Sequence, residues 1–245
     1  MKAKRVQPRR SWALFVLLAT ALAMAAGDAA ESPYISPRDV DLARFLPPPP
    51  TPDSAAQRRD LDAVLEIQRT RTKAQIADAQ ADQKTSVFRF ADVLGKNFSE
   101  DRLPKTAALA EKACRETSAV VAVAKQSWSR PRPYVTSREV KPVLSNVTAG
   151  SYPSGHATCG YIWAIILADM IPEKRDELIV RGIRYGQNRV VGGVHYPTDA
   201  EAGRLSGAVI AVALSNNPVF RSDFDSAKAE LREVMGYSRE GVALH

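Results

Sequence analysis

The second half of the chain contains three clusters of charged and polar side chains whose types and spacing suit the binding and transfer of an anion. In chain order these residues are Lys125 and Arg132, then Ser154, Gly155 and His156, and then Arg189, His195 and Asp199. Together they supply three cations, two imidazoles and a carboxylate, although the whole chain has only three histidines. Such a set suits phosphoryl transfer, where catalysis consists mostly of positioning the phosphoryl group and neutralising charge on its oxygens.

The second cluster has the composition of an anion site at a helix N-terminus. Ser154 can cap the helix, Gly155 lets the backbone approach a ligand, and the free N–H groups of the first turn add partial positive charge. Taken alone, Pro153-Ser154-Gly155-His156 fits an ordinary start of a helix better than a binding site. The flanking clusters reverse that preference.

The third cluster contains a histidine that a carboxylate can support. Gly192 and Gly193 allow the chain to bend before His195, and Pro197 begins the next helix. Asp199 then lies in the first turn of that helix, from which it can reach back to His195. A carboxylate partner fixes the imidazole tautomer and leaves the other ring nitrogen free to attack or to bind.

The first cluster lies at the end of a predicted helix over 104–129. Lys125 is in its last turn, and Arg132 lies between Pro131 and Pro133, which stop the helix and present the guanidinium from a rigid turn. Solvated charges around a helix end would explain these two cations on their own. The other two clusters make the anion site the better interpretation.

Hydrophobic periodicity predicts helices along nearly the whole chain after residue 53. The run 157–170 is apolar on all sides, which is typical of a buried central helix. No stretch alternates as a strand does, and no internal repeat is present. The predicted fold is all-α, a compact single-domain helical bundle built around this central apolar helix. The first long helix is expected to have Asp53 or Ser54 as its N-cap. The other helices are expected to cover 87–94, 104–129, 172–188, 197–216 and 224–235.

The first 25 residues are predicted to be a signal peptide, followed by one domain over 26–245. Five bases and no acid precede an apolar stretch that contains the small-x-small pattern Ala23-Met24-Ala25. Cleavage is expected after Ala25, with sites down to Ala30 as alternatives. An uncleaved membrane anchor is the alternative, but the apolar stretch is shorter than the roughly 18 to 20 residues that a span needs. We therefore expect export to the periplasm.

The net charge of +7 belongs mostly to this leader. The remaining chain has 29 bases against 27 acids, so no nucleic-acid partner is expected. No membrane association is expected after the leader is removed either, because the later run 161–171 is short and contains Asp169.

Cys114 and Cys159 are expected to be buried free thiols, with a disulfide as the alternative that an oxidising compartment permits. Cys159 lies less than one turn after His156, whereas Cys114 lies eleven residues, about 16 Å of helix, before Lys125. If Lys125 and His156 meet at one site, the two sulfurs would be too far apart to bond. No cluster of Cys and His indicates a metal site.

The order Lys125-x6-Arg132-Pro133, Pro153-Ser154-Gly155-His156 and Arg189-x5-His195-x3-Asp199 resembles a three-part signature. Class A bacterial non-specific acid phosphatases, lipid phosphatases of the phosphatidic acid phosphatase type 2 superfamily and vanadium haloperoxidases share it. The leader, the proline run at 47–50 and the chain length are similar to the class A enzymes in particular. One departure is Asn188, where the family commonly has serine. Asparagine can still hydrogen-bond, so little loss is expected, although a contact to Arg189 or to phosphate can differ.

The resemblance implies a broad-range phosphomonoesterase that forms a phosphohistidine and has possible phosphotransferase activity. It implies that His195 is the nucleophile, that Asp199 orients it, and that His156 protonates the leaving oxygen and then activates water. The residues it assigns to the phosphoryl oxygens are Lys125, Arg132, Ser154, Gly155 and Arg189. No metal or cofactor is implied, the partners are small-molecule phosphomonoesters, activity is expected on the acid side, and homo-oligomers are common in the family.

Three alternatives remain open. A vanadium-dependent haloperoxidase would use the same residues to hold vanadate, although such proteins look larger, with longer spacers. A phosphate-binding protein would need the cations but not the pair of His195 and Asp199. A membrane lipid phosphatase is disfavoured because the chain lacks the apolar spans that it would need.

Overall fold

The computed structural model describes residues 33–238, so the predicted signal peptide lies outside the described residues. Within this range the chain forms helices and loops and no strand, which confirms the all-α prediction. The α-helices are α1 (Leu42–Phe45), α2 (Ala55–Thr70), α3 (Lys73–Ala81), α4 (Ala91–Leu94), α5 (Pro104–Trp128), α6 (Pro133–Thr136), α7 (Gly155–Met170), α8 (Arg175–Val191), α9 (Pro197–Asn216) and α10 (Pro218–Met235). Short 3₁₀ turns cover Val87–Phe90 and Pro172–Lys174.

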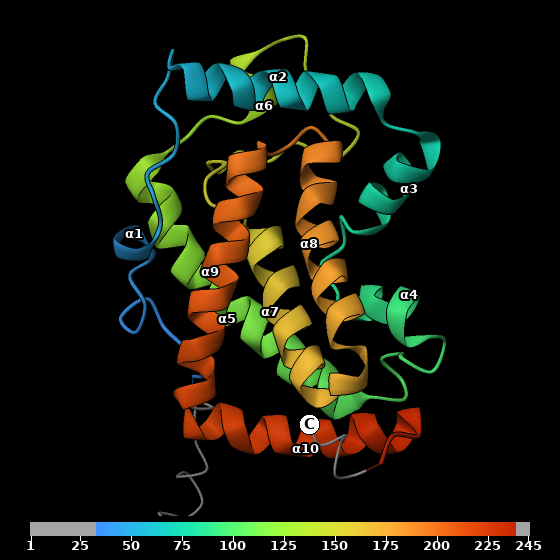
Figure 1. Cartoon of the computed structure of the whole chain (residues 1–245). Coiled ribbons are helices and arrows are strands. Elements are labelled where there is room, and N and C mark those ends of the chain that lie inside the picture. The colour runs from blue at the N-terminus through green and yellow to red at the C-terminus, as the bar shows by residue number, and fades with distance from the viewer. Residues whose placement is uncertain (1–32, 239–245) are drawn as a thin grey trace, which may run out of the picture. The chain divides into compact units, whose positions relative to one another are not determined.

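Helix α7 is the central helix that the apolar run predicted. Its N-cap is Ser154, and the side chains of Ile162, Ala164 and Leu167 are fully buried. Figure 1 shows α7 between α8 and α9, and α5 also packs against it. Burial on every side explains why the sequence of this helix lacks a polar face.

Small residues let α8 and α9 approach α7 closely. A Cβ atom at Gly203 of α9 would lie 2.5 Å from the carbonyl oxygen of Ser154, and one at Gly182 of α8 would lie 2.4 Å from the Cβ of Ala164. Glycine is therefore required at both contacts, since any side chain would push the helices apart. This close packing brings the helix ends that carry the predicted clusters to one place.

Two helices cross the ends of this layer. In Figure 1, α2 crosses one end of α8 and α9, and α10 crosses the other ends of α9 and α5. Ser54 caps α2 as predicted, and α9 has the predicted bounds. The predicted helix over 87–94 is divided into a 3₁₀ turn and α4. Between residues 33 and 238 no helix combines the length and apolar character that crossing a membrane requires.

The prediction of free thiols was wrong, because Cys114 and Cys159 form a disulfide with their Cα atoms 5.2 Å apart. Helices α5 and α7 run antiparallel: the position of Gly155 faces Val121, whereas the indole N–H of Trp163 donates to the carbonyl of Ala110. Both cysteines therefore lie in the same direction from the helix ends. Counted from the facing pair of Gly155 and Val121, Cys159 lies four residues and Cys114 seven residues further along, roughly 6 and 10 Å of helix, so the two cysteines are nearly level.

Removing this disulfide is expected to lower the free energy of unfolding by about 4 kcal/mol, because a bond between residues 45 apart restricts the unfolded chain. The test is urea denaturation of the double variant Cys114→Ser/Cys159→Ser beside the wild type, each with and without a thiol reductant. The reductant should destabilise the wild type and leave the variant unchanged. A variant as stable as the oxidised wild type would contradict the prediction.

Candidate active site

The ends of α5, α7 and α9 meet and bring the predicted clusters together. Lys125 lies in the last turn of α5, and its Nζ donates to the carbonyl oxygens of Gly150 and Ser151 at 2.7 and 3.3 Å. The backbone N–H of Ser154, at the start of α7, donates to the carbonyl of Asp199 in the first turn of α9 at 3.0 Å. Burial and the neighbouring charge of Arg132 lower the pKa of Lys125 to about 7.

Arg132 joins the loop before α7 to His195. Its Nε donates to the carbonyl of Ala149 and its Nη1 to the carbonyl of Val194, both at 2.8 Å. The same Nη1 lies 3.1 Å from Nε2 of His195. Because a guanidinium can only donate, Nε2 of His195 accepts this bond and carries no proton.

The proton of the neutral His195 ring is therefore on Nδ1, which lies 3.3 Å from Oδ2 of Asp199. This carboxylate oxygen also accepts the backbone N–H of Tyr196 at 2.9 Å, which fixes its orientation. Burial, followed by the charges of Arg132 and Lys125, holds the pKa of His195 well below its usual value. The arrangement is that of a neutral imidazole whose Nε2 lone pair faces the cations, as a nucleophile requires.

Arg189 lies in the last turn of α8 and is 3% exposed. Of the guanidinium groups at the site, it has the fewest hydrogen-bond partners among the described residues. Within residues 33–238, its Nε and Nη1 are buried without a hydrogen-bond partner. Burial and the charge of Arg132 lower its pKa to about 10. A buried guanidinium with unpaired donors beside a second cation is costly unless an anion binds there.

Ser154 and Gly155 form the start of α7 as the sequence predicted. Oγ of Ser154 accepts the N–H of Ala157 at 3.4 Å, so this serine caps the helix. A Cβ atom at Gly155 would find only Val121 nearby, at 3.8 Å, so the backbone here is open to close approach. The free N–H groups of this first turn lie at the positive end of the helix dipole, where they would stabilise a bound anion.

His156 is held by the segment between α3 and the 3₁₀ turn Val87–Phe90, which the sequence did not implicate. Its Nε2 lies 3.1 Å from the carbonyl oxygen of Gln83 and 3.2 Å from Oγ1 of Thr85. Its ring stacks on Tyr185 with the centroids 6.3 Å apart. Burial, followed by the charge of Arg189, lowers the pKa of His156 to about 4.

The structure thus brings all eight predicted residues to one site.

Asn188, the departure from the family pattern, contacts two carboxylates rather than Arg189. Its side-chain amide donates to Asp82 at 2.8 Å and to Asp78 at 3.0 Å. Asp82 is fully buried and also accepts two bonds from Arg181. Since Asp82 precedes Gln83, Asn188 ties α8 to the segment that holds His156.

Asn188→Ala is expected to lower the free energy of unfolding by about 1–3 kcal/mol, because a donor to the buried Asp82 carboxylate is lost. Urea denaturation measures this difference. The matched control is Asn216→Ala, since Asn216 is exposed at the end of α9, and its effect should stay within about 0.5 kcal/mol. Equal stabilities of the two variants would show that the Asn188 contacts contribute nothing.

Arg130 is 4% exposed, and its place beside the site was not predicted from the sequence. Its Nη1 lies 2.6 Å from Oδ1 of Asp199, and its Nη2 lies 2.6 Å from Oδ2 of Asp60 on α2. Nothing beside Arg130 in the sequence distinguishes it from a solvated loop residue. The available signal was Asp60 itself, a carboxylate four residues before Val64 on the apolar face of α2.

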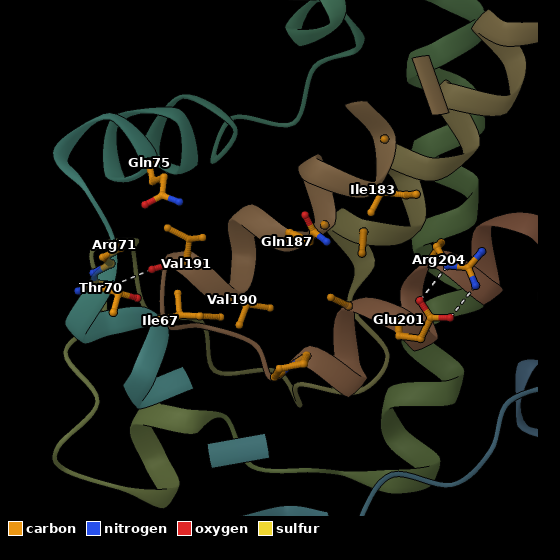
Figure 2. A pocket seen from close by; sticks show the side chains of 15 residues that line it. Ile67, Thr70, Arg71, Gln75, Ile183, Gln187, Val190, Val191, Glu201 and Arg204 are labelled. Carbon is orange, nitrogen blue, oxygen red and sulfur yellow. Dashed lines mark hydrogen bonds and ion pairs between the residues drawn. The ribbon is translucent and has the colours of Figure 1, made fainter. Parts of the chain in front are cut away.

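Three of the cavities near the site differ in which site residues line them. Figure 2 shows a cavity of about 420 Å³ with Arg71 and Val191 on one side and Arg204 on another, and none of the eight predicted residues lines it. A cavity of about 450 Å³ is lined by Lys125 and Arg132, and another of about 450 Å³ by Thr85 and Cys114. The last two border groups that contact His195 and His156.

The electrostatics favour an anionic ligand. The charge of Arg132 lowers the pKa of both Lys125 and Arg189, so a phosphate-sized anion would relieve this repulsion. In the range 33–238, no group of three or more His, Cys, Asp or Glu side chains is arranged to hold a metal ion.

Comparison with known proteins agrees with this site. The PAP2 superfamily matches residues 113–222, which span Lys125 to Asp199. An acid phosphatase of Zymomonas mobilis is 32% identical over 77% of this chain and 75% of its own. A non-specific acid phosphatase of Salmonella typhimurium is 31% identical over 82% of this chain and 84% of its own.

A solved structure shares the fold. The transmembrane PAP2 type phosphatidylglycerolphosphate phosphatase of Bacillus subtilis superposes with a TM-score of 0.50 over 71% of this chain and 89% of its own, at 18% identity. Sequence relatives, fold and the spacing of the three clusters agree. The chain belongs to the PAP2 superfamily, in the group of its members named non-specific acid phosphatases.

Proposed function

We propose that this protein is an exported, metal-independent acid phosphatase that hydrolyses a broad range of small phosphate monoesters through a phosphohistidine. The observation that carries the proposal is the state of His195. Its Nδ1 faces Asp199 and its Nε2 faces Arg132, beside the unpaired donors of Arg189. A nucleophile and the cations that would hold a phosphoryl group therefore lie together.

In the first step, Nε2 of His195 attacks phosphorus, a P–N bond forms, and the ester P–O bond breaks. The leaving oxygen takes a proton from His156. In the second step, His156 removes a proton from water, which attacks phosphorus, and the P–N bond breaks to release phosphate. Asp199 balances the positive charge that the ring of His195 carries in the intermediate.

His156 transfers this proton from Nδ1. The Gln83 carbonyl can only accept, so it keeps a proton on Nε2 of His156. A pKa of about 4 leaves His156 mostly neutral in the empty site at mildly acidic pH. A bound phosphoryl dianion offsets the charge of Arg189 and raises this pKa, so substrate binding itself loads the acid.

Lys125, Arg132 and Arg189 hold the phosphoryl oxygens in this proposal, with Ser154 and the N–H of Gly155 at the start of α7. An alcohol in the place of water would give phosphotransferase activity. The predicted leader over 1–25 would deliver the enzyme to the periplasm, and assembly into homo-oligomers remains a prediction. The acid phosphatase relatives favour this reaction over that of a vanadium haloperoxidase.

The test is hydrolysis of p-nitrophenyl phosphate by the mature protein between about pH 4 and pH 9, around the reference pKa of histidine, with and without EDTA. We expect activity on the acid side that survives EDTA. Absence of hydrolysis by the folded protein would overturn the proposal. Bromination of a phenolic dye with vanadate and peroxide would then test the haloperoxidase alternative.

The alkaline limb of the pH profile is expected to report Lys125. With a pKa of about 7, this side chain is charged below that pH and loses its charge above it, so kcat/KM should fall as the pH rises through about 7. Lys125→Arg should move the limb upward by more than about one pH unit, because arginine keeps its charge. Both proteins are assayed on the same substrate, so its own titration cancels. Coincident limbs would assign the fall to another group.

A further inference from the structure

We propose that Arg130 and Asp60 are positioning residues for the nucleophile. Their buried ion pair orients the Asp199 carboxylate and keeps it ionised for His195, without touching the phosphate. This inference rests on the proposed phosphohistidine mechanism. It extends the active site to Asp60 of α2, which lies outside the segment matched by the PAP2 superfamily.

The geometry divides the two oxygens of Asp199 between two partners. Oδ1 accepts Nη1 of Arg130 at 2.6 Å. Oδ2 accepts the N–H of Tyr196 at 2.9 Å and lies 3.3 Å from Nδ1 of His195. Arg130 thus fixes the side of the carboxylate that faces away from the imidazole, so the other side remains directed at His195.

Arg130 is itself held on several sides. Its Nη2 donates to Oδ2 of Asp60 and to Oε1 of Gln57, at 2.6 and 2.7 Å, and Thr198 accepts from its Nη1 at 2.8 Å. Its guanidinium lies 4.0 Å above the ring of Tyr196. The side chains of Arg130, Asp60 and Asp199 are 3%, 6% and 0% exposed. A guanidinium fixed this firmly can hold a carboxylate in one orientation.

The charges of Asp60, Arg130 and Asp199 suit the chemistry proposed for His195. Burial raises the pKa of Asp199, and the charge of Arg130 is the largest influence opposing that rise, with Lys125 also opposing it. Asp60, Arg130 and Asp199 together carry one net negative charge when ionised. The ring of His195 becomes positive when the P–N bond forms, so the intermediate leaves this buried group neutral.

Arg130 and Arg132 differ by two positions and take different roles on either side of Pro131. Arg132 faces Nε2 of His195, where the P–N bond would form. Arg130 faces the carboxylate behind the ring. Two arginines of the same turn would therefore act on opposite sides of the same imidazole, and substitutions of the two should give different kinetic signatures.

The experiment compares Arg130→Met, Arg130→Lys, Asp60→Asn and Arg132→Met with the wild type. It measures kcat over pH and inhibition by inorganic phosphate. Arg130→Met should lower kcat by about 10²-fold, with the phosphate inhibition constant within about threefold of the wild type. Arg130→Lys should recover part of kcat. Arg132→Met should weaken phosphate inhibition by more than about tenfold.

The acid limb of kcat provides the readout that a merely structural role would not move. Without the cation of Arg130, Asp199 gains a proton more readily. The acid limb should therefore move to higher pH in Arg130→Met, and by a smaller amount in Arg130→Lys. Asp60→Asn removes a competing anion, so its limb should move to lower pH.

Acid limbs that coincide in all these variants would overturn the inference, as would equal losses of kcat and phosphate affinity in Arg130→Met. If Arg130→Met does not fold, the limbs of Arg130→Lys and Asp60→Asn decide. An inactive wild type would instead remove the proposed function, so the two failures are distinguishable.

Discussion

His195→Ala is expected to lower kcat for phosphate monoesters by at least about 10⁴-fold, because the variant has no group to form the phosphoenzyme. The loss should appear with an activated substrate such as p-nitrophenyl phosphate as well as with alkyl phosphates. Alkaline quenching of a reaction with ³²P-labelled substrate should recover labelled wild-type protein and no labelled variant, since a phosphoramidate survives in alkali.

His156→Ala is the informative partner of this variant. p-Nitrophenolate leaves without a proton, so the first step should proceed, whereas the second step lacks its base. Labelled phosphoenzyme should therefore accumulate above the wild-type level while turnover falls. His245→Ala, a change to the third histidine of the chain, is the control and should retain full activity. More than about 1% of wild-type kcat in His195→Ala, or label on that variant, would refute His195 as the nucleophile.

The arrangement of the helices could be predicted from the sequence where one pattern dominated. The run from Ala157 to Met170 has no polar face, so it could only lie at the centre of the bundle. Pro197 and the apolar positions after it gave the bounds of α9. The disulfide between Cys114 and Cys159 could not be predicted in this way, because periodicity gives neither the relative direction nor the register of two packed helices.

The candidate site could be predicted where residues close in sequence carry the chemistry. His195 and Asp199 lie four residues apart at a helix start, so local geometry alone brings them together. Arg130 and Asp60 are 70 residues apart, and only the crossing of α2 over the helix ends joins them. The carbonyl of Gln83 that holds His156 belongs to the backbone, and no side-chain pattern could indicate it.

Arg189→Met is expected to lose activity without losing stability. Donors of Arg189 are buried without partners, and burial together with Arg132 lowers its pKa to about 10. In the proposed reaction these donors meet the phosphoryl oxygens, so kcat/KM should fall by about 10³-fold. In the empty enzyme the same charge is uncompensated, so its replacement by a side chain of similar length should leave the free energy of unfolding equal or higher.

Urea denaturation with and without inorganic phosphate measures both consequences. Phosphate at a hundred times its dissociation constant should stabilise the wild type by about 2.7 kcal/mol and should hardly affect Arg189→Met at the same concentration. Arg184→Met is the matched control on α8, because Arg184 is half exposed and paired with Asp92, and it should keep the response to phosphate. A less stable Arg189→Met variant that phosphate still stabilises fully would mean that Arg189 supports the fold and not the anion.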